Sequence, residues 1–338
     1  MSGSGSLSPT GGATRTVKRW VRGAIFAFSG LCFAWVLWPI WRHARELGET
    51  IHAGPLVGWI VAGAGAYAFF SVLLGLGWWW LSGIYGSLPS PRTGYAIWAR
   101  SQLAKYLPGN AFQFVSRQIL GREIGLSHPA LVASGLLEMG SQLLAAVLIA
   151  VAGAALSRWS TPASVSLLWV VLLGAGSLLA WPAIDALLRR IPRTASWMAE
   201  LPRLSVGQTL RLLGPAIALY ALFFLTTGSL VFGLLVGGWG EAPVGLWRVI
   251  WLYAVAWAVG TVTVGAPAGV GVREAILTLQ LEPLIGAANA AALAVVLRLV
   301  TTAGDLVTAL VGWSLRDPRM GPPGPSMKSS PETKEIRS

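Results

Sequence analysis

Long apolar runs separated by short polar segments dominate this sequence. Several of these runs are long enough, and carry few enough charges, to form membrane-spanning helices. They cover residues 23–40, 55–84, 129–156, 163–188, 212–236, 246–264 and 287–315. The pattern therefore predicts an all-α polytopic membrane protein with about seven or eight transmembrane helices.

Two further stretches, 95–125 and 265–283, are moderately apolar and are interrupted by Pro and Gly. Irregular backbone at membrane depth is tolerated only where protein buries it or where it lines a water-filled cavity. A broken helix also exposes backbone N–H groups and a partial positive charge, which favour an anion such as phosphate. Two re-entrant segments and an anion site are predicted, and ordinary loops with snorkelling basic residues are the alternative. The residues expected to bind this anion, which in a membrane could be a lipid headgroup, are Lys105, Gly109, Arg117, Gly269, Gly271, Arg273 and Arg298.

Polar residues inside the predicted spans form a second group. Glu138 and Gln142 share one helix face, and Arg298, Thr302 and Asp305 share another. A charge at mid-membrane is costly unless it is paired or hydrated, so both faces should point into the bundle. The side chains on these faces either line a path for a lipid headgroup or form structural ion pairs, such as Glu138 with Arg298. The residues expected along a path, as polar groups, counter-ions or proton carriers, are Glu138, Gln142, Glu274 and Asp305.

Charged residues predict the orientation. The basic residues around 15–22 and 189–211 indicate that the N-terminus and the second cluster are cytoplasmic, in a bacterial-type inner membrane. A cytoplasmic C-terminus requires an even number of crossings, which favours a crossing by 265–283; otherwise the tail lies outside. Residues 15–316 are expected to form a single transmembrane domain. Its polar flanks, 1–14 and 317–338, are expected to be disordered.

Composition narrows the function classes. Hydrophobic residues make up 54% and charged residues 11%, which excludes a soluble enzyme, a disordered chain and a fibrous protein. The net charge of +12 suits anionic lipids as partners rather than nucleic acid, because the basic residues lie between apolar runs. One cysteine and three scattered histidines predict no metal site, and no cofactor is expected. Most of the 18 tryptophans lie near span ends, which is typical of interfacial anchors rather than of an aromatic substrate cage.

Two blocks resemble a known family. The runs SQLAKYLPGNAFQFVSRQILGREIG and PAGVGVREAILTLQL look like the hallmarks of the flippase-like transmembrane region of lysylphosphatidylglycerol synthases. The resemblance covers about Val17 to Leu315 and implies a helical domain that moves lipids between leaflets. Asn110 stands where a basic residue is common, and Ala268 where a glycine is common. The residues matched by motif are Lys105, Pro108, Gly109, Arg117, Pro267, Gly269, Gly271, Arg273 and Glu274.

Three functions are compatible with these features. The leading hypothesis is a flippase that moves an anionic phospholipid or a polyprenyl-phosphate-linked lipid through a basic cavity. Transport would be passive or ion-coupled, because the sequence has no nucleotide-binding motif. The alternatives are a non-transporting partner of a glycosyltransferase and a membrane-embedded lipid-phosphate enzyme, although no catalytic constellation is recognised. Lysyl transfer is not expected, because 338 residues leave no room for a soluble synthase domain.

Overall fold

The computed structural model describes residues 53–85, 90–106, 112–122, 124–156, 186–187, 189–199, 201–202, 206–239, 244–263 and 267–315. Every regular element within these ranges is helical, which confirms the all-α class. The predicted span at 23–40, most of the span at 163–188, both predicted tails and Gly109 lie outside the described residues.

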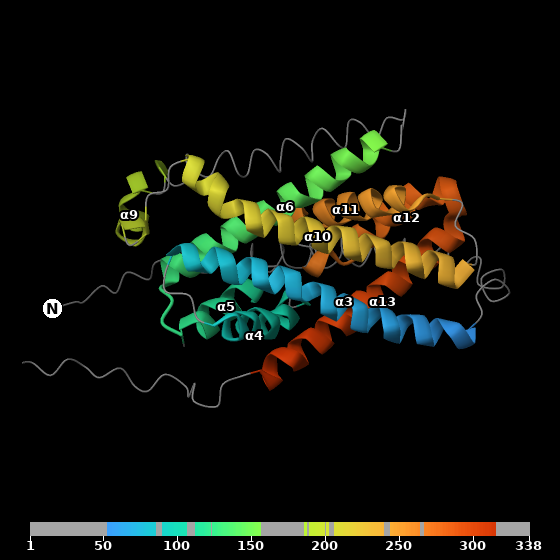
Figure 1. Cartoon of the computed structure of the whole chain (residues 1–338), viewed down its shortest axis with the longest axis horizontal. Coiled ribbons are helices and arrows are strands. Elements are labelled where there is room, and N and C mark those ends of the chain that lie inside the picture. The colour runs from blue at the N-terminus through green and yellow to red at the C-terminus, as the bar shows by residue number, and fades with distance from the viewer. Residues whose placement is uncertain are drawn as a thin grey trace, which may run out of the picture.

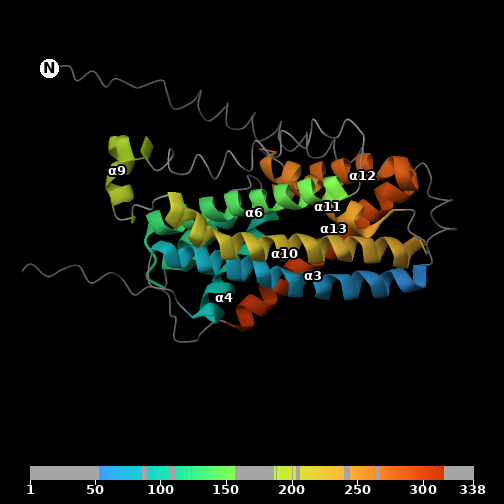
Figure 2. The same ribbon diagram turned by 45° about the horizontal axis from the view of Figure 1, so that its top comes forward.

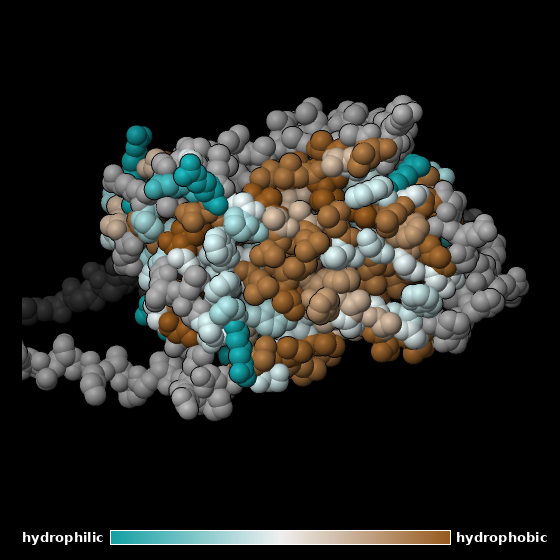
Figure 3. Space-filling view, in the orientation of Figure 1, coloured by the Kyte–Doolittle hydropathy of each residue, from teal (hydrophilic) through white to brown (hydrophobic). Residues whose placement is uncertain are grey.

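Four helices are long and apolar enough to cross a membrane, counted over the described residues. They are α3 (Ala53–Ser82), α6 (His128–Leu156), α10 (Val206–Trp239) and α13 (Ala287–Ser314). The helices α3, α6 and α10 run side by side, and α13 crosses them (Figures 1 and 2). Hydrophobic side chains cover most of the middle of the face in Figure 3, whereas hydrophilic ones lie mainly toward its ends. The protein is therefore a multi-pass membrane protein.

A helical hairpin, hairpin 1, forms the first broken segment. It consists of α4 (Pro91–Ser101), the 3-10 turn η2 (Gln102–Tyr106) and α5 (Phe112–Arg122). The short turn η1 (Gly83–Tyr85) follows α3, before the hairpin begins. The Ser90 hydroxyl caps α4 by accepting a hydrogen bond from the Thr93 amide.

Hairpin 1 enters the bundle and returns to the end at which it began. Along α4, Gly94 packs near Trp79 and Tyr95 near Gly75, so α4 runs antiparallel to α3 toward the middle of the bundle. Along α5, Phe114 lies against Gly135. Gly121, seven residues later, lies against Leu131, nearer the start of α6. The segment is therefore re-entrant, as predicted.

The second broken segment has a similar form. Hairpin 2 consists of α11 (Leu246–Val262), the turn η3 (Pro267–Gly269) and α12 (Val272–Ile285). Ile250 lies against Gly228 of α10, and Trp257 against Phe224, so α11 runs antiparallel to α10. The next helix, α12, then returns alongside α13.

This topology corrects two predictions. Residues 246–264 were expected to form a complete span, and a crossing by 265–283 was favoured over the alternative of a C-terminal tail outside. Both are instead arms of one hairpin, because α11 has only 17 residues and the Gly269–Gly271 turn reverses the chain. Hairpin 2 begins at the end opposite to hairpin 1 (Figure 1). The two tips, η2 and η3, contact each other inside the bundle.

Small residues allow the hairpins and helices to approach closely. Gly63, Gly75 and Gly77 of α3 pack against Val300, Tyr95 and Tyr220. Gly65 of the same helix faces open space. Among the described residues, four tryptophans are buried in the bundle: Trp78, Trp98, Trp251 and Trp257.

A cavity between the two hairpin tips

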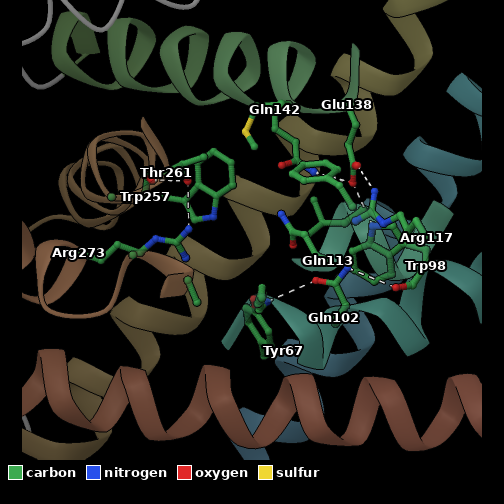
Figure 4. A pocket seen from close by; sticks show the side chains of 17 residues that line it. Tyr67, Trp98, Gln102, Gln113, Arg117, Glu138, Gln142, Trp257, Thr261 and Arg273 are labelled. Carbon is green, nitrogen blue, oxygen red and sulfur yellow. Dashed lines mark hydrogen bonds and ion pairs between the residues drawn. The ribbon is translucent and has the colours of Figure 1, made fainter. Parts of the chain in front are cut away.

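The tips of the two hairpins enclose a cavity of about 110 Å³, which is room for several water molecules (Figure 4). Hairpin 1 contributes residues from Trp98 to Arg117, and hairpin 2 contributes residues from Trp257 to Arg273. The wall is completed by α3 and by α6. The cavity is level with Tyr67 of α3, close to the midpoint of that helix. Both predicted broken segments therefore line one shared hollow at the middle of the bundle.

Arg117 is neutralised by Glu138 of α6. Its Nη1 pairs with Glu138 Oε2, and its Nε donates to Ser101 Oγ at 3.0 Å. Glu138 Oε1 also accepts hydrogen bonds from Trp98 Nε1 at 3.0 Å and from Gln142 Nε2 at 3.2 Å. Both charged side chains are 5% exposed, so this pair is buried and saturated. It ties α4, α5 and α6 together and leaves Arg117 little capacity for a ligand.

Asp305 of α13 holds the tip of hairpin 1. Lys105 Nζ lies 2.7 Å from Asp305 Oδ2, and the Tyr106 hydroxyl donates to the same oxygen at 2.5 Å. Tyr106 also donates to Thr302 Oγ1 at 3.4 Å, and its ring lies under the Arg298 guanidinium, 5.5 Å from the guanidinium carbon. The polar face predicted on this helix therefore docks η2.

Glu274 joins the start of α12 to α13. Its Oε2 accepts a hydrogen bond from the Gly271 amide at 2.7 Å, and its Oε1 lies 3.5 Å from Arg298 Nη1. That nitrogen also donates to the Ala268 carbonyl oxygen at 3.3 Å. The amide that the sequence offered to an anion is thus satisfied by the protein's own carboxylate. Glu274 acts as a capping residue and as a counter-ion.

Arg273 is different from the other cations of the site. Its Nη2 donates to Thr261 Oγ1 at 3.0 Å, and its guanidinium carbon lies 5.2 Å from the centre of the Trp257 ring. Its Nε has no hydrogen-bond partner within the described part of the chain. Among the described residues no carboxylate forms an ion pair with Arg273. The side chain lines both this cavity and a smaller one between α11, α12 and α13.

Two glycines make the space that Arg273 occupies. A Cβ on Gly260 would stand 2.2 Å from Arg273 Cγ, and a Cβ on Gly269 would stand 2.8 Å from Arg273 Nε. Gly269 also has a φ of +68°, which favours glycine. Next to it lies Ala268, whose φ of 51° places a non-glycine residue in the left-handed region. The turn thus depends on glycine to seat Arg273 and is strained at Ala268.

The charges around the two cavities do not balance. Four cations line the two cavities. Three of them pair with carboxylates, so one cavity-lining cation has no carboxylate partner among the described residues. An uncompensated charge at mid-membrane is unfavourable, so the arrangement favours an anionic ligand carrying one negative charge. The pairs are Arg117 with Glu138, Lys105 with Asp305 and Arg298 with Glu274, and the remaining cation is Arg273.

The structure brings most of the predicted site residues together around the two cavities, but their ion pairs differ from the suggested one. The suggested pair of Glu138 with Arg298 is wrong, because α5 reaches Glu138 first and Arg298 turns to Glu274. Gln142 lies on the cavity wall beside Glu138. Within the described residues, no group of three His, Cys, Asp or Glu side chains could hold a metal ion.

Several residues of the site were missed by the sequence analysis. Tyr106 stands inside the first block, next to Lys105, and its position in the motif could have drawn attention to it. Nothing in the pattern of α11 distinguishes its cavity-lining residues from ordinary membrane-facing ones. The missed residues are Trp98, Gln102, Tyr106, Gln113, Trp257, Gly260 and Thr261.

Comparison with known proteins agrees with the two sequence blocks. Among curated proteins, none matches the chain. The family model described as "Lysylphosphatidylglycerol synthase TM region" matches residues 20–310, which include both hairpins and all four long helices except the last residues of α13. This chain therefore belongs to the family of the lysylphosphatidylglycerol synthase transmembrane region.

Proposed function

We propose that this protein moves anionic lipids between the two leaflets of the membrane. The headgroup passes through the cavity between the hairpin tips, and the hydrocarbon chains remain in the bilayer. The observation that carries this proposal is Arg273, a cation without a carboxylate partner among the described residues, on the wall of a cavity at mid-depth. Membership of a family connected with lipid handling supports it.

The two hairpins give the headgroup a route. Because they enter from opposite ends, a phosphate at their tips is separated from each side of the membrane by one hairpin. Movement of either hairpin against the long helices would open the cavity to one side only. Arg273 lies at the boundary between the larger and the smaller cavity, so it can hold the phosphate in both conformations.

The orientation follows from the basic residues. We place the end that carries α9 (Pro192–Ala199) and hairpin 1 on the cytoplasmic side of an inner membrane, because Arg189, Arg190 and Arg211 cluster there (Figure 1). Hairpin 1 then opens to the cytoplasm and hairpin 2 to the opposite side. A reporter fused after Ser338 tests this orientation, since α13 ends at the same side.

Transport by the purified protein in vesicles tests the function. A fluorescent phosphatidylglycerol is followed by chemical quenching of the outer leaflet, with wild type, Arg273→Gln and Arg122→Gln. Arg122 is an exposed arginine at the end of α5 and serves as the matched control. We expect Arg273→Gln to slow transport at least tenfold and Arg122→Gln to leave it unchanged.

A stability measurement separates a loss of transport from a loss of folding. Arg273 has no carboxylate to leave unpaired among the described residues, so Arg273→Gln should melt within a few degrees of wild type in detergent. Wild-type transport rates in a stably folded Arg273→Gln variant would overturn the proposal. Arg273→Lys should retain part of the activity, because it keeps the charge but loses the planar guanidinium.

A further inference from the structure

Uncharged hydrogen-bonding groups also line the cavity, and the ion pairs use them only in part. Three glutamines line it, and each comes from a different element: Gln102 from η2, Gln113 from α5 and Gln142 from α6. A cation alone is sufficient to attract a phosphate. Three converging carboxamides therefore need another explanation.

Gln113 is the most available of the three. Its side chain forms no hydrogen bond with any described residue, and its amide points into the space between the other labelled side chains (Figure 4). Gln142 donates Nε2 to Glu138, but its oxygen has no partner among the described residues. Two acceptor oxygens and one amide nitrogen thus face the cavity unused.

Gln102 is committed in part. Its Nε2 donates to the Trp98 carbonyl oxygen at 3.4 Å, and its Oε1 accepts a long hydrogen bond of 3.4 Å from Lys105 Nζ. Each of these interactions is near the limit of hydrogen-bond length, so the amide can accept a better partner. The lining is therefore incomplete without a ligand or water that both donates and accepts.

Hydroxyl groups match this requirement. A carboxamide offers two donors and two acceptor lone pairs, and a hydroxyl both donates and accepts. Trp98 and Trp257 lie on two sides of Gln113 and contribute aromatic side chains to the cavity wall (Figure 4). The cavity thus combines one unpaired cation, hydrogen-bonding amides and aromatic walls, counted over the described residues.

We propose that the transported lipid is a singly charged phosphodiester whose headgroup carries neighbouring hydroxyls, as in a polyol or a sugar. Arg273 binds the phosphate, and Gln113, with Gln142, binds the hydroxyls. This inference rests on the proposed lipid transport and adds the headgroup class to it. A glycerophospholipid and a polyprenyl phosphosugar both have this chemistry.

Two lipids that differ only in hydroxyls test the inference. Phosphatidylglycerol and phosphatidylpropanol have the same phosphodiester charge, but the second has no headgroup hydroxyl. Their transport is compared in vesicles for wild type, Gln113→Met and Gln118→Met. Gln118 is the matched control, because it lies on α5 outside the cavity and pairs with His128. A polyprenyl phosphohexose and a polyprenyl methyl phosphate form a second pair that identifies the lipid source.

We expect wild type to move phosphatidylglycerol, or the phosphohexose, about tenfold faster than its hydroxyl-free counterpart, since one hydrogen bond is worth about that factor. Gln113→Met should remove most of this preference by slowing the hydroxylated lipid. Gln118→Met should keep it. Equal wild-type rates within both pairs would overturn the hydroxyl assignment while leaving lipid transport intact.

Binding separates the two proposals when no lipid is moved. Retention of each lipid by the detergent-solubilised protein is compared by native mass spectrometry, with the same variants. Selective retention of the hydroxylated lipid, lost in Gln113→Met, supports the headgroup assignment even if transport is absent. Absence of both transport and selective retention overturns both proposals.

Discussion

The two hairpins present an arginine to the same cavity, but in opposite electrostatic states. Arg117 of hairpin 1 is held by Glu138 and Ser101 and is saturated. Arg273 of hairpin 2 has a hydroxyl and an aromatic ring but no carboxylate among the described residues. Both follow a break in a helix, so this position alone does not determine the role. The partner decides whether an arginine holds the fold or remains available to an anion.

The largest expected effect on stability comes from breaking the ion pair of Arg117 with Glu138. Arg117→Ala leaves Glu138 as an unpaired charge that is 5% exposed. We expect the free energy of unfolding to fall by about 3–5 kcal/mol, the usual cost of breaking a buried pair. Thermal unfolding in detergent measures this loss.

A double variant checks the cause. Arg117→Met with Glu138→Gln removes both charges and should recover much of the lost stability. If the double variant is as unstable as Arg117→Ala, the ion pair is not what holds hairpin 1.

The next largest effect is expected at Gly260, which makes room for the Arg273 side chain. Gly260→Ala places a methyl group 2.2 Å from Arg273 Cγ, so the side chain must leave the Trp257 face. We expect a loss of about 1–3 kcal/mol in unfolding free energy, as in other overpacked sites, together with slower lipid transport. Gly58→Ala on α3 is the control, because a methyl group there would meet no described atom within 4 Å. Equal behaviour of the two variants would contradict the role given to Gly260.

A third variant makes hairpin 1 resemble hairpin 2. Asp305→Asn keeps an acceptor for Tyr106 but removes the counter-ion of Lys105, which gives the cavity a second unpaired cation. We expect a cost of about 1–2 kcal/mol, below that of Arg117→Ala because Lys105 is 18% exposed. The ratio of phosphatidic acid to phosphatidylglycerol transport should rise. An unchanged ratio would show that Asp305 does not set the charge of the site.

The smallest effect has the opposite sign. Ala268 has a φ of 51°, a conformation that costs a non-glycine residue roughly 1–2 kcal/mol. Ala268→Gly removes this strain but adds backbone freedom to the unfolded chain, worth roughly 0.5–1 kcal/mol. A net stabilisation of about 0.5 kcal/mol is expected from these two terms, visible as a small rise in melting temperature. A fall would mean that the Ala268 methyl group makes contacts that outweigh the strain.

The sequence predicted the fold well where apolar runs are long. The spans near 55–84, 129–156, 212–236 and 287–315 agree with α3, α6, α10 and α13 to within six residues at each end. The sequence did not predict where the chain reverses inside the bundle, because a segment such as 246–264 has the same composition whether it crosses the membrane or turns back. Only the packing of Ile250 and Trp257 along α10 shows that the chain reverses.

The site was predictable in content but not in pairing. The sequence identified Lys105, Arg117, Arg273, Glu274 and Asp305, since charges in apolar surroundings are conspicuous. Which cation meets which carboxylate depends on contacts between helices that lie far apart in the chain. The neutral lining was harder still, because a glutamine such as Gln113 has no helical spacing that distinguishes a cavity from a surface.

Glu274 has a mechanical consequence. Its two oxygens serve the Gly271 amide and the Arg298 guanidinium at once. The Gly271 amide, at the start of α12, moves together with its acceptor, but swinging α12 away from α13 would take the carboxylate from Arg298 and leave two opposite charges unpaired in a poorly hydrated layer. The returning arm of hairpin 2 is therefore fastened to the last helix, and opening the cavity on the side of hairpin 2 requires either that this ion pair breaks or that α12 moves together with α13.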